Sequence, residues 1–155
     1  MVSGRFPPWL VKRLPNPRKA HNIKSLMRSK YLHTVCEEAR CPNLVDCFSR
    51  GTATFMIAGD ICTRTCGYCS VSKGSPLQLD LMEPSNVAET VKIMKLKHVV
   101  VTMVNRDDLT DGASEHVANT VRSIRAKNPS AKIEVLVSDF LGDIESVETV
   151  ISSEP

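Results

Sequence analysis

Three short runs rich in apolar residues divide the chain from residue 53 onward. They are ATFMIA (53–58), HVVVTMV (98–104) and KIEVLVS (132–138). The first is continuously apolar, which is typical of a strand that is buried on both faces of a parallel sheet. The pattern therefore predicts buried β-strands at the first two positions and a third strand at 132–138.

Each run is followed by a stretch in which apolar residues recur at helical spacing. Helices are expected over 83–97, from about 113 to 127, and from about 141 onward. In the first of them, Pro84 lies near the start, and Asn86 and Glu89 form a candidate capping box. The sequence Asn128-Pro129 is expected to end the second.

Strands and helices thus alternate as βαβαβα, and each interval between strands leaves room for one crossover helix. This order predicts an α/β fold with a parallel sheet. A closed eight-unit barrel takes about 250 residues, and no GxGxxG or GxxxxGKS/T loop follows any predicted strand. We therefore interpret the fold as the first half of a partial (β/α) barrel, with chemistry expected at the carboxyl ends of its strands.

Residues 1–50 differ from the rest in composition. Five of the nine prolines lie there, so we expect this segment to be mostly irregular, apart from a short helix near 22–29. The first 30 residues carry eight Lys or Arg and no acidic residue. The remaining 12 basic and 17 acidic residues give the rest of the chain a formal charge of −5. We expect two parts, a basic arm with a cysteine-bearing segment at 1–50 and the sheet at 51–155.

A solvated arm is the simpler interpretation of the basic residues, and a surface for an acidic partner is the alternative. Apolar residues make up 42% and charged residues 24%, as in ordinary globular proteins. No apolar run approaches the roughly 18 residues of a membrane-spanning helix, and the N-terminus has no stretch typical of a signal peptide. We therefore expect a cytoplasmic protein with reduced thiols and no membrane attachment. Aromatic residues, at 5%, argue against a nucleic acid partner.

All six cysteines lie between residues 36 and 69, in two groups of three. The first group, spaced C-x4-C-x5-C, and the second, spaced C-x3-C-x2-C, are Cys36, Cys41, Cys47 and Cys62, Cys66, Cys69. Three disulfides would allow 15 pairings, but they suit a small secreted scaffold better than a cytoplasmic chain. Metal ligation is the better explanation of both groups.

The odd number of thiols in each group limits the kind of metal site that the group can form. A structural zinc site takes four ligands, so it could form at 36–47 only with a further ligand such as His33. A 4Fe–4S cluster has four irons, and three thiolates leave the fourth open to a ligand that is not protein. The group at 62–69 directly follows the first predicted strand. It therefore predicts an iron–sulfur cluster whose open iron binds a substrate.

The C-x3-C-x2-C motif after the first strand of a βα series, with Tyr68 just before its third cysteine, resembles the radical S-adenosylmethionine enzymes. The C-x4-C-x5-C motif in TVCEEARCPNLVDC narrows the resemblance. Together with GTATFMIAGD, RDDLTDGAS and EVLVSDFLGD, it makes the chain similar to the N-terminal half of lipoyl synthase from PPWLVKRLP onward. The double motif separates it from biotin synthase. The chain departs from the family pattern at Asn105, Ala113 and Ser138, where an aspartate, a glycine and a proline are usual.

The resemblance implies a partial barrel of the radical S-adenosylmethionine type, with two 4Fe–4S clusters and S-adenosylmethionine as cofactors. The thiols of Cys62, Cys66 and Cys69 would hold the cluster that binds S-adenosylmethionine. The thiols of Cys36, Cys41 and Cys47 would hold an auxiliary cluster that donates sulfur. The candidate contacts to S-adenosylmethionine are Tyr68, Asn105 and Arg106. No catalytic residue is expected beyond the cluster ligands.

The implied activity is that of a sulfurtransferase, which inserts two sulfur atoms at C6 and C8 of a protein-bound octanoyl-lysine to give lipoyl-lysine. These carbons are unactivated, so the cofactor has to supply a radical. The implied partners are octanoylated lipoyl domains of 2-oxoacid dehydrogenases or the glycine-cleavage H protein, with flavodoxin or ferredoxin as reductant. Because the chain resembles about half of such an enzyme, we expect it to be inactive alone. An inactive truncated fragment and a non-catalytic zinc-binding module are the alternatives.

Charged residues after the first two predicted strands have two interpretations each. The carboxylates of Asp107, Asp108 and Asp111 could bind a metal, but a solvated loop that caps a helix is favoured. The guanidinium groups of Arg64 and Arg106 could hold anionic groups of the cofactor, or they could be ion-paired at the surface.

The methionines in the predicted strands and helices are expected to pack in the core and not to bind metal. They are Met56, Met94 and Met103. A structural role is expected for His98, which begins the second predicted strand.

Overall fold

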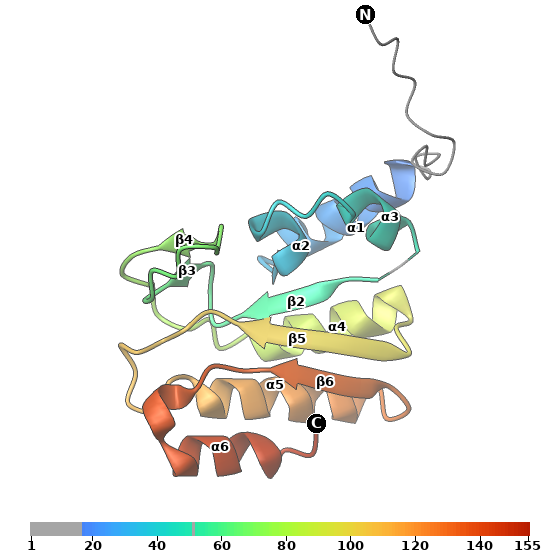
Figure 1. Ribbon diagram of the computed structural model, residues 1–155. Helices are drawn as coiled ribbons and strands as arrows, with labels where there is room; N and C mark the ends of the chain where they lie inside the picture. Colours follow the sequence, from blue (N-terminus) through green and yellow to red (C-terminus); the bar gives the residue numbers. More distant parts are fainter. Residues whose placement is uncertain (1–16, 51) are drawn as a thin grey trace, which may run out of the picture.

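The computed structural model describes residues 17–50 and 52–155, and within them the three predicted strands form one parallel sheet. The strands are β2 (Thr54–Ile57), β5 (His98–Met103) and β6 (Lys132–Leu136). A short strand, β1 (His33–Thr34), pairs antiparallel with β2 and gives the order β1-β2-β5-β6. Figure 1 shows β2, β5 and β6 side by side. The α/β class and the parallel sheet predicted from the sequence are confirmed.

The three predicted helices are present and follow the three parallel strands. They are α4 (Glu83–Met94), α5 (Ser114–Lys127) and α6 (Ile144–Ile151), the last preceded by the 3-10 helix η2 (Phe140–Gly142). Both α4 and α5 cover one face of the sheet (Figure 1). The side chains of Phe55, Val101 and Val135 are aligned across the three strands and pack in the same core as α4 and α5.

The opposite face of the sheet is left for the functional site. Side chains alternate between the two faces of a strand, so the residues next to the core positions point away from α4 and α5. Among them, Met56, Thr102 and Leu136 are paired in register across the three strands. All three line a cavity described below.

The predicted capping box of α4 is wrong, although Pro84 does lie at the helix start. The N-cap is Met82, whose side chain makes no capping hydrogen bond. The amide of Asn86 instead donates to the Lys30 carbonyl at 3.3 Å, and Glu89 pairs with the Lys30 ammonium at 2.8 Å. Both residues join α4 to the N-terminal segment, a contact between distant residues that local spacing does not encode.

The N-terminal segment is not mostly irregular where it is described. Its helices are α1 (Pro17–Ser29), α2 (Val35–Glu38) and α3 (Leu44–Ser49). Since Pro17 is the first residue of α1, its fixed φ and missing N–H suit the helix. The helices pack through Met27 and Phe48, which are fully buried. The prolines at 7, 8 and 15 and the first basic residues lie outside the described residues.

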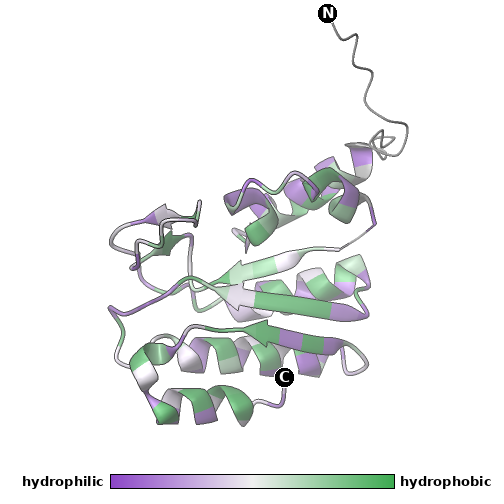
Figure 2. Ribbon diagram, viewed as in Figure 1, coloured by the Kyte–Doolittle hydropathy of each residue, from purple (hydrophilic) through white to green (hydrophobic). Residues whose placement is uncertain are grey.

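The third predicted strand is confirmed as β6, and it is buried on one face only. Its side chains alternate, with Ile133 buried and Lys132, Glu134 and Leu136 exposed. Figure 2 shows β5 as largely hydrophobic and β6 as mixed. The reason is position, because β6 is the edge strand of the sheet in the described part of the chain.

Two smaller expectations concern packing. Met56 is buried, and Met94 and Met103 are partly buried against the core, so their packing role is confirmed. The His98 side chain is half-exposed, and its Nε2 lies 3.1 Å from a carboxylate oxygen of Glu134 on the neighbouring strand.

Within residues 17–50 and 52–155, no helix has the length and apolar character needed to cross a membrane.

Candidate functional site

The second cysteine group lies in a closed loop at the carboxyl end of β2. The chain turns away from β2 at Ala58 and Gly59, which both have positive φ. It then forms β3 (Ile61–Cys62), which pairs in parallel with β4 (Ser72–Lys73). This pairing places Cys62 opposite Lys73 and closes the segment 62–73, which we call the cysteine loop.

Hydrogen bonds hold the cysteine loop internally. The Gly74 N–H donates to the Cys62 carbonyl at 3.0 Å, and the Cys69 N–H donates to the Cys66 carbonyl at 3.2 Å. The Lys73 ammonium also donates to the Cys66 carbonyl, at 2.9 Å. The loop backbone is therefore shaped by the chain itself around its three thiols.

All three thiols of the cysteine loop line one cavity of about 460 Å³. This volume falls in the range of roughly 300–1,000 Å³ that is common for small-molecule sites. Its apolar lining residues come from the sheet and the strand ends, from the cysteine loop and from α2 and its C-cap: Val35, Ala39, Met56, Val71, Met103, Val104, Leu136 and Val137. Its polar lining residues are Arg64, Tyr68, Lys73, Thr102, Asn105 and Ser138. The cavity is thus apolar on the sheet side and polar around the thiols.

Two of the three candidate contacts to S-adenosylmethionine lie at this cavity. The Tyr68 side chain lines it and is exposed to solvent. The Asn105 amide faces the Cys62 sulfur at 4.0 Å. When the oxygen and nitrogen of the Asn105 amide exchange places, the amide oxygen accepts from Arg64 Nε at 3.1 Å and from Nη1 at 3.2 Å. In that orientation its NH₂ group faces Cys62, as a thiolate would prefer.

The third candidate, Arg106, is buried and does not line the cavity. Its guanidinium donates to the Asp108 carboxylate at 2.9 and 2.8 Å. It also donates to the carbonyls of Ala58 and Leu77, both at 3.0 Å. These bonds connect the turn after β2 with the loop that precedes α4. The hydrogen bonds from Arg106 lower the pKa of the Asp108 carboxyl below its usual value.

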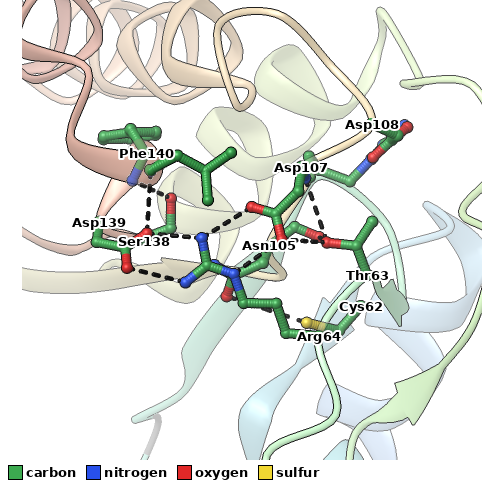
Figure 3. Close-up of polar contacts among 11 residues, drawn as sticks. Cys62, Thr63, Arg64, Asn105, Asp107, Asp108, Ser138, Asp139 and Phe140 are labelled. Carbon is green, nitrogen blue, oxygen red and sulfur yellow. Dashed lines mark hydrogen bonds and ion pairs between the residues drawn. The ribbon is translucent and has the colours of Figure 1, made fainter.

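Arg64 joins the ends of the three parallel strands (Figure 3). Its Nε and Nη2 donate to Asp107, both at 2.8 Å, and its Nη1 and Nη2 donate to Asp139 at 2.9 and 2.7 Å. These hydrogen bonds are the main cause of a lowered pKa at both carboxyls, to about 2 at Asp139. They also raise the pKa of Arg64 itself. Arg64 is therefore ion-paired, as one of its two interpretations proposed.

The three aspartates after β5 have separate partners. Asp107 pairs with Arg64, and Asp108 pairs with Arg106. The Asp111 carboxylate accepts from the N–H groups of Ala113 and Glu115, both at 3.1 Å. Helix capping is confirmed for Asp111. Capping matters here because Ala113, the N-cap residue of α5, has φ +69° and provides no side-chain acceptor.

A buried pair that the sequence interpretation missed supports the turn after β2. The Glu83 carboxylate lies 2.6 Å from His116 Nε2 and accepts from the Ala58 N–H at 2.9 Å. Both side chains are buried. Helical spacing was the available signal, since His116, Thr120 and Ile124 recur every four residues on the buried face of α5.

The first cysteine group lies in and around α2 and α3. Burial raises the pKa of the Cys36 thiol, and the charges of Cys41 and Cys47 raise it further. The Cys41 N–H donates to the Cys36 carbonyl at 3.1 Å. These thiols do not line the cavity, but Val35 and Ala39 on either side of Cys36 do. The candidate zinc ligand His33 lies 3.7 Å from Glu38.

The donor set of both groups fits an iron–sulfur cluster. All six cysteines are free thiols, and soft thiolates are the usual ligands of such clusters. In the described ranges, no three His, Cys, Asp or Glu side chains surround a point where one metal ion would bind.

Comparison with known proteins leads to the same family that the two cysteine motifs resemble. Residues 2–41 match the family described as the N-terminal domain of lipoyl synthase of the radical SAM family. The chain is 56% identical to a lipoyl synthase of Wigglesworthia glossinidia brevipalpis over 150 residues, which cover 96% of this chain and 48% of the relative. It is 51% identical to a lipoyl synthase of Laribacter hongkongensis over 97% of this chain and 48% of the relative.

A more distant relative gives the same result. The lipoyl synthase of Caldicellulosiruptor saccharolyticus is 46% identical over all 155 residues, which cover 54% of that protein. The chain therefore spans about half the length of the curated relatives it matches. It belongs to the lipoyl synthase family and corresponds to the N-terminal half of its members.

Proposed function

We propose that the chain provides the N-terminal half of a lipoyl synthase, which inserts two sulfur atoms at C6 and C8 of an octanoyl group carried on a lysine of an acceptor protein. The observation that carries this proposal is identity of 46–56% to lipoyl synthases over nearly the whole chain. The acceptors would be lipoyl domains of 2-oxoacid dehydrogenases or the glycine-cleavage H protein. Flavodoxin or ferredoxin would be the reductant.

The two cysteine groups would hold two 4Fe–4S clusters. The cysteine loop would bind one cluster through Cys62, Cys66 and Cys69, whose thiols share a cavity. The α2–α3 segment would bind the other through Cys36, Cys41 and Cys47. When bound, the clusters and S-adenosylmethionine supply the electron, the radical chemistry and the sulfur that this reaction requires.

The cavity has features that suit S-adenosylmethionine. Its apolar sheet side would exclude water from the reacting groups, and Tyr68 and Asn105 would contact the cofactor at its polar side. Arg106 would act indirectly, because its donors already bind Asp108 and two carbonyl groups. Its bonds would keep the turn after β2 in place beneath the cysteine loop.

The free face of the sheet would form the interior of a partial barrel. The aligned side chains of Met56, Thr102 and Leu136 would point into it. Further βα units would pair with the edge of β6, which is exposed in the described part of the chain. The segment that carries Cys36, Cys41 and Cys47 would cover the barrel mouth, consistent with Val35 and Ala39 on the cavity wall.

The test joins this chain to the downstream half of one of its relatives and follows two products of one reaction. Chromatography measures 5′-deoxyadenosine, and mass spectrometry measures the lipoyl group on the acceptor. We expect Cys62→Ala to abolish both products. We expect Cys36→Ala to leave at least part of the nucleoside and no lipoyl product. The 155-residue chain alone is expected not to turn over.

Three outcomes would contradict the proposal. The first is normal sulfur insertion by the Cys62→Ala chain. The second is equal loss of the nucleoside in both variants while the Cys62 group of the Cys36→Ala chain still holds iron. The third is a joined chain that binds zinc in place of iron, which would indicate a non-catalytic zinc-binding module.

A further inference from the structure

Arg64 lies in the middle of the C-x3-C-x2-C motif, two residues from Cys62 and two from Cys66. Its four hydrogen bonds to Asp107 and Asp139 use Nε, Nη1 and both N–H groups of Nη2. The remaining N–H of Nη1 faces the Asn105 oxygen when that amide is turned toward Arg64. A guanidinium has five N–H donors, so none is left for an anionic group of the cofactor.

The partners of Arg64 come from the loops that follow the other two parallel strands, β5 and β6. Asp107 follows β5, and Asp139 follows β6 and caps η2 by accepting from the Leu141 N–H at 3.1 Å. One side chain of the cysteine loop therefore contacts the loops that follow β5 and β6 (Figure 3). The carboxyl ends of β2, β5 and β6 are joined at a single guanidinium.

Thr63, the neighbour of Arg64, adds a second connection to the loop after β5. Its N–H donates to the Asn105 carbonyl at 3.1 Å. Its hydroxyl lies 3.0 Å from the Asp107 carboxylate and accepts from the Asp107 N–H at 3.2 Å. The two residues after Cys62 are thus fixed to the loop at 105–107 by backbone and side chain together.

The geometry of the ion pairs favours arginine specifically. Each edge of the guanidinium meets both oxygens of one carboxylate, and paired N–H···O bonds of this kind are stronger and more directional than single ones. A lysine carries its charge at one point and cannot bind two carboxylates in this way. The Arg64 and Asp107 side chains are each 27% exposed and the Asp139 side chain 65% exposed, so Asp107 makes the more sheltered pair.

We propose that Arg64 is a positioning residue, which fixes the cysteine loop to the loops after β5 and β6 so that its three thiols face one cavity before a cluster binds. The inference rests on the proposed function for the identity of the cluster. The loop fixation itself is a property of the chain and is tested without any cluster.

The test is amide hydrogen exchange of the cluster-free 155-residue chain. We expect Arg64→Met to speed exchange roughly tenfold in the cysteine loop, with Thr63 and Gly74 as the reporting amides, because bonds to charged groups contribute about that factor. Arg64→Lys should restore only part of the protection. The control Arg122→Met removes an exposed pair with Glu115 on α5 and should change nothing in the loop. Loop exchange that is the same in Arg64→Met and Arg122→Met overturns the proposal.

A milder variant guards against general unfolding. Asp139→Asn removes one ion pair, while asparagine can still cap η2. We expect it to speed exchange in the cysteine loop by less than Arg64→Met does and to leave α4 and α5 protected. If Arg64→Met loses protection against amide exchange throughout the chain, the variant has unfolded, and the proposal is then judged on Asp139→Asn. Unchanged loop exchange in Asp139→Asn would then overturn the proposal.

Iron content after anaerobic reconstitution provides the readout for positioning. We expect Arg64→Met to lose iron at the Cys62 group and to keep it at the Cys36 group, as Arg122→Met should keep both. Full loading of Arg64→Met despite a loosened loop would overturn the positioning role. If the unchanged chain takes up no iron, the proposed function fails, and hydrogen exchange alone decides whether Arg64 fixes the loop.

Discussion

Glu83 is a single residue on which the start of the cysteine loop depends. Its carboxylate is 4% exposed and binds both His116 and the Ala58 N–H. Ala58 has φ +67°, a conformation that non-glycine residues rarely adopt, so the surrounding bonds have to hold it. The buried carboxylate thereby connects α4, α5 and the turn after β2.

We expect Glu83→Ala to lower the free energy of unfolding by about 3 kcal/mol, because it leaves a buried imidazole and a buried N–H without their partner. Glu83→Gln should cost less, since an amide oxygen can still accept from Ala58. Urea denaturation followed by circular dichroism measures both. The control is Glu148→Ala on the exposed face of α6, expected to change stability by less than about 0.5 kcal/mol. An equally small effect of Glu83→Ala would contradict this role.

The loops after β2, β5 and β6 behave as one element because Arg64 binds both Asp107 and Asp139. The hydrogen bonds from Arg64 lower the pKa of the Asp139 carboxyl to about 2 and also lower that of Asp107. A carboxyl with a lowered pKa stabilises the folded chain above its ordinary pKa. That contribution is lost as the pH falls toward the lowered value.

The thermal midpoint of the unchanged chain should therefore exceed that of Asp139→Asn at about pH 6, and the difference should shrink between about pH 4 and about pH 2. Because asparagine can replace aspartate as a cap of η2, the difference reports mainly the ion pair. Thermal unfolding of both proteins at several pH values measures it. A difference that stays constant over this range would show that the pair with Arg64 does not contribute.

At the scale of the whole molecule, the sequence predicted what depends on local periodicity. Continuous apolar runs located β2 and β5, and helical spacing located α5, since Val117, Val121 and Ile124 are fully buried as expected. The order of these elements predicted the parallel sheet. It also predicted that the cysteine loop follows the carboxyl end of β2, as it does.

Features that depend on contacts between distant residues were missed. Asn86 and Glu89 bind Lys30 in place of capping α4. Likewise, Arg64 had two equal interpretations until Asp107 and Asp139, 43 and 75 residues away, were found beside it.

We propose that this chain binds two 4Fe–4S clusters through two separate cysteine groups, and that one group lines a cavity that suits S-adenosylmethionine. The most direct test is the iron and sulfide content of the 155-residue chain after anaerobic reconstitution. We expect loading to approach about 8 irons and 8 sulfides per chain, and Cys62→Ala or Cys36→Ala each to remove about half. Bound zinc in place of iron, or an iron content unchanged by Cys62→Ala, would contradict the claim.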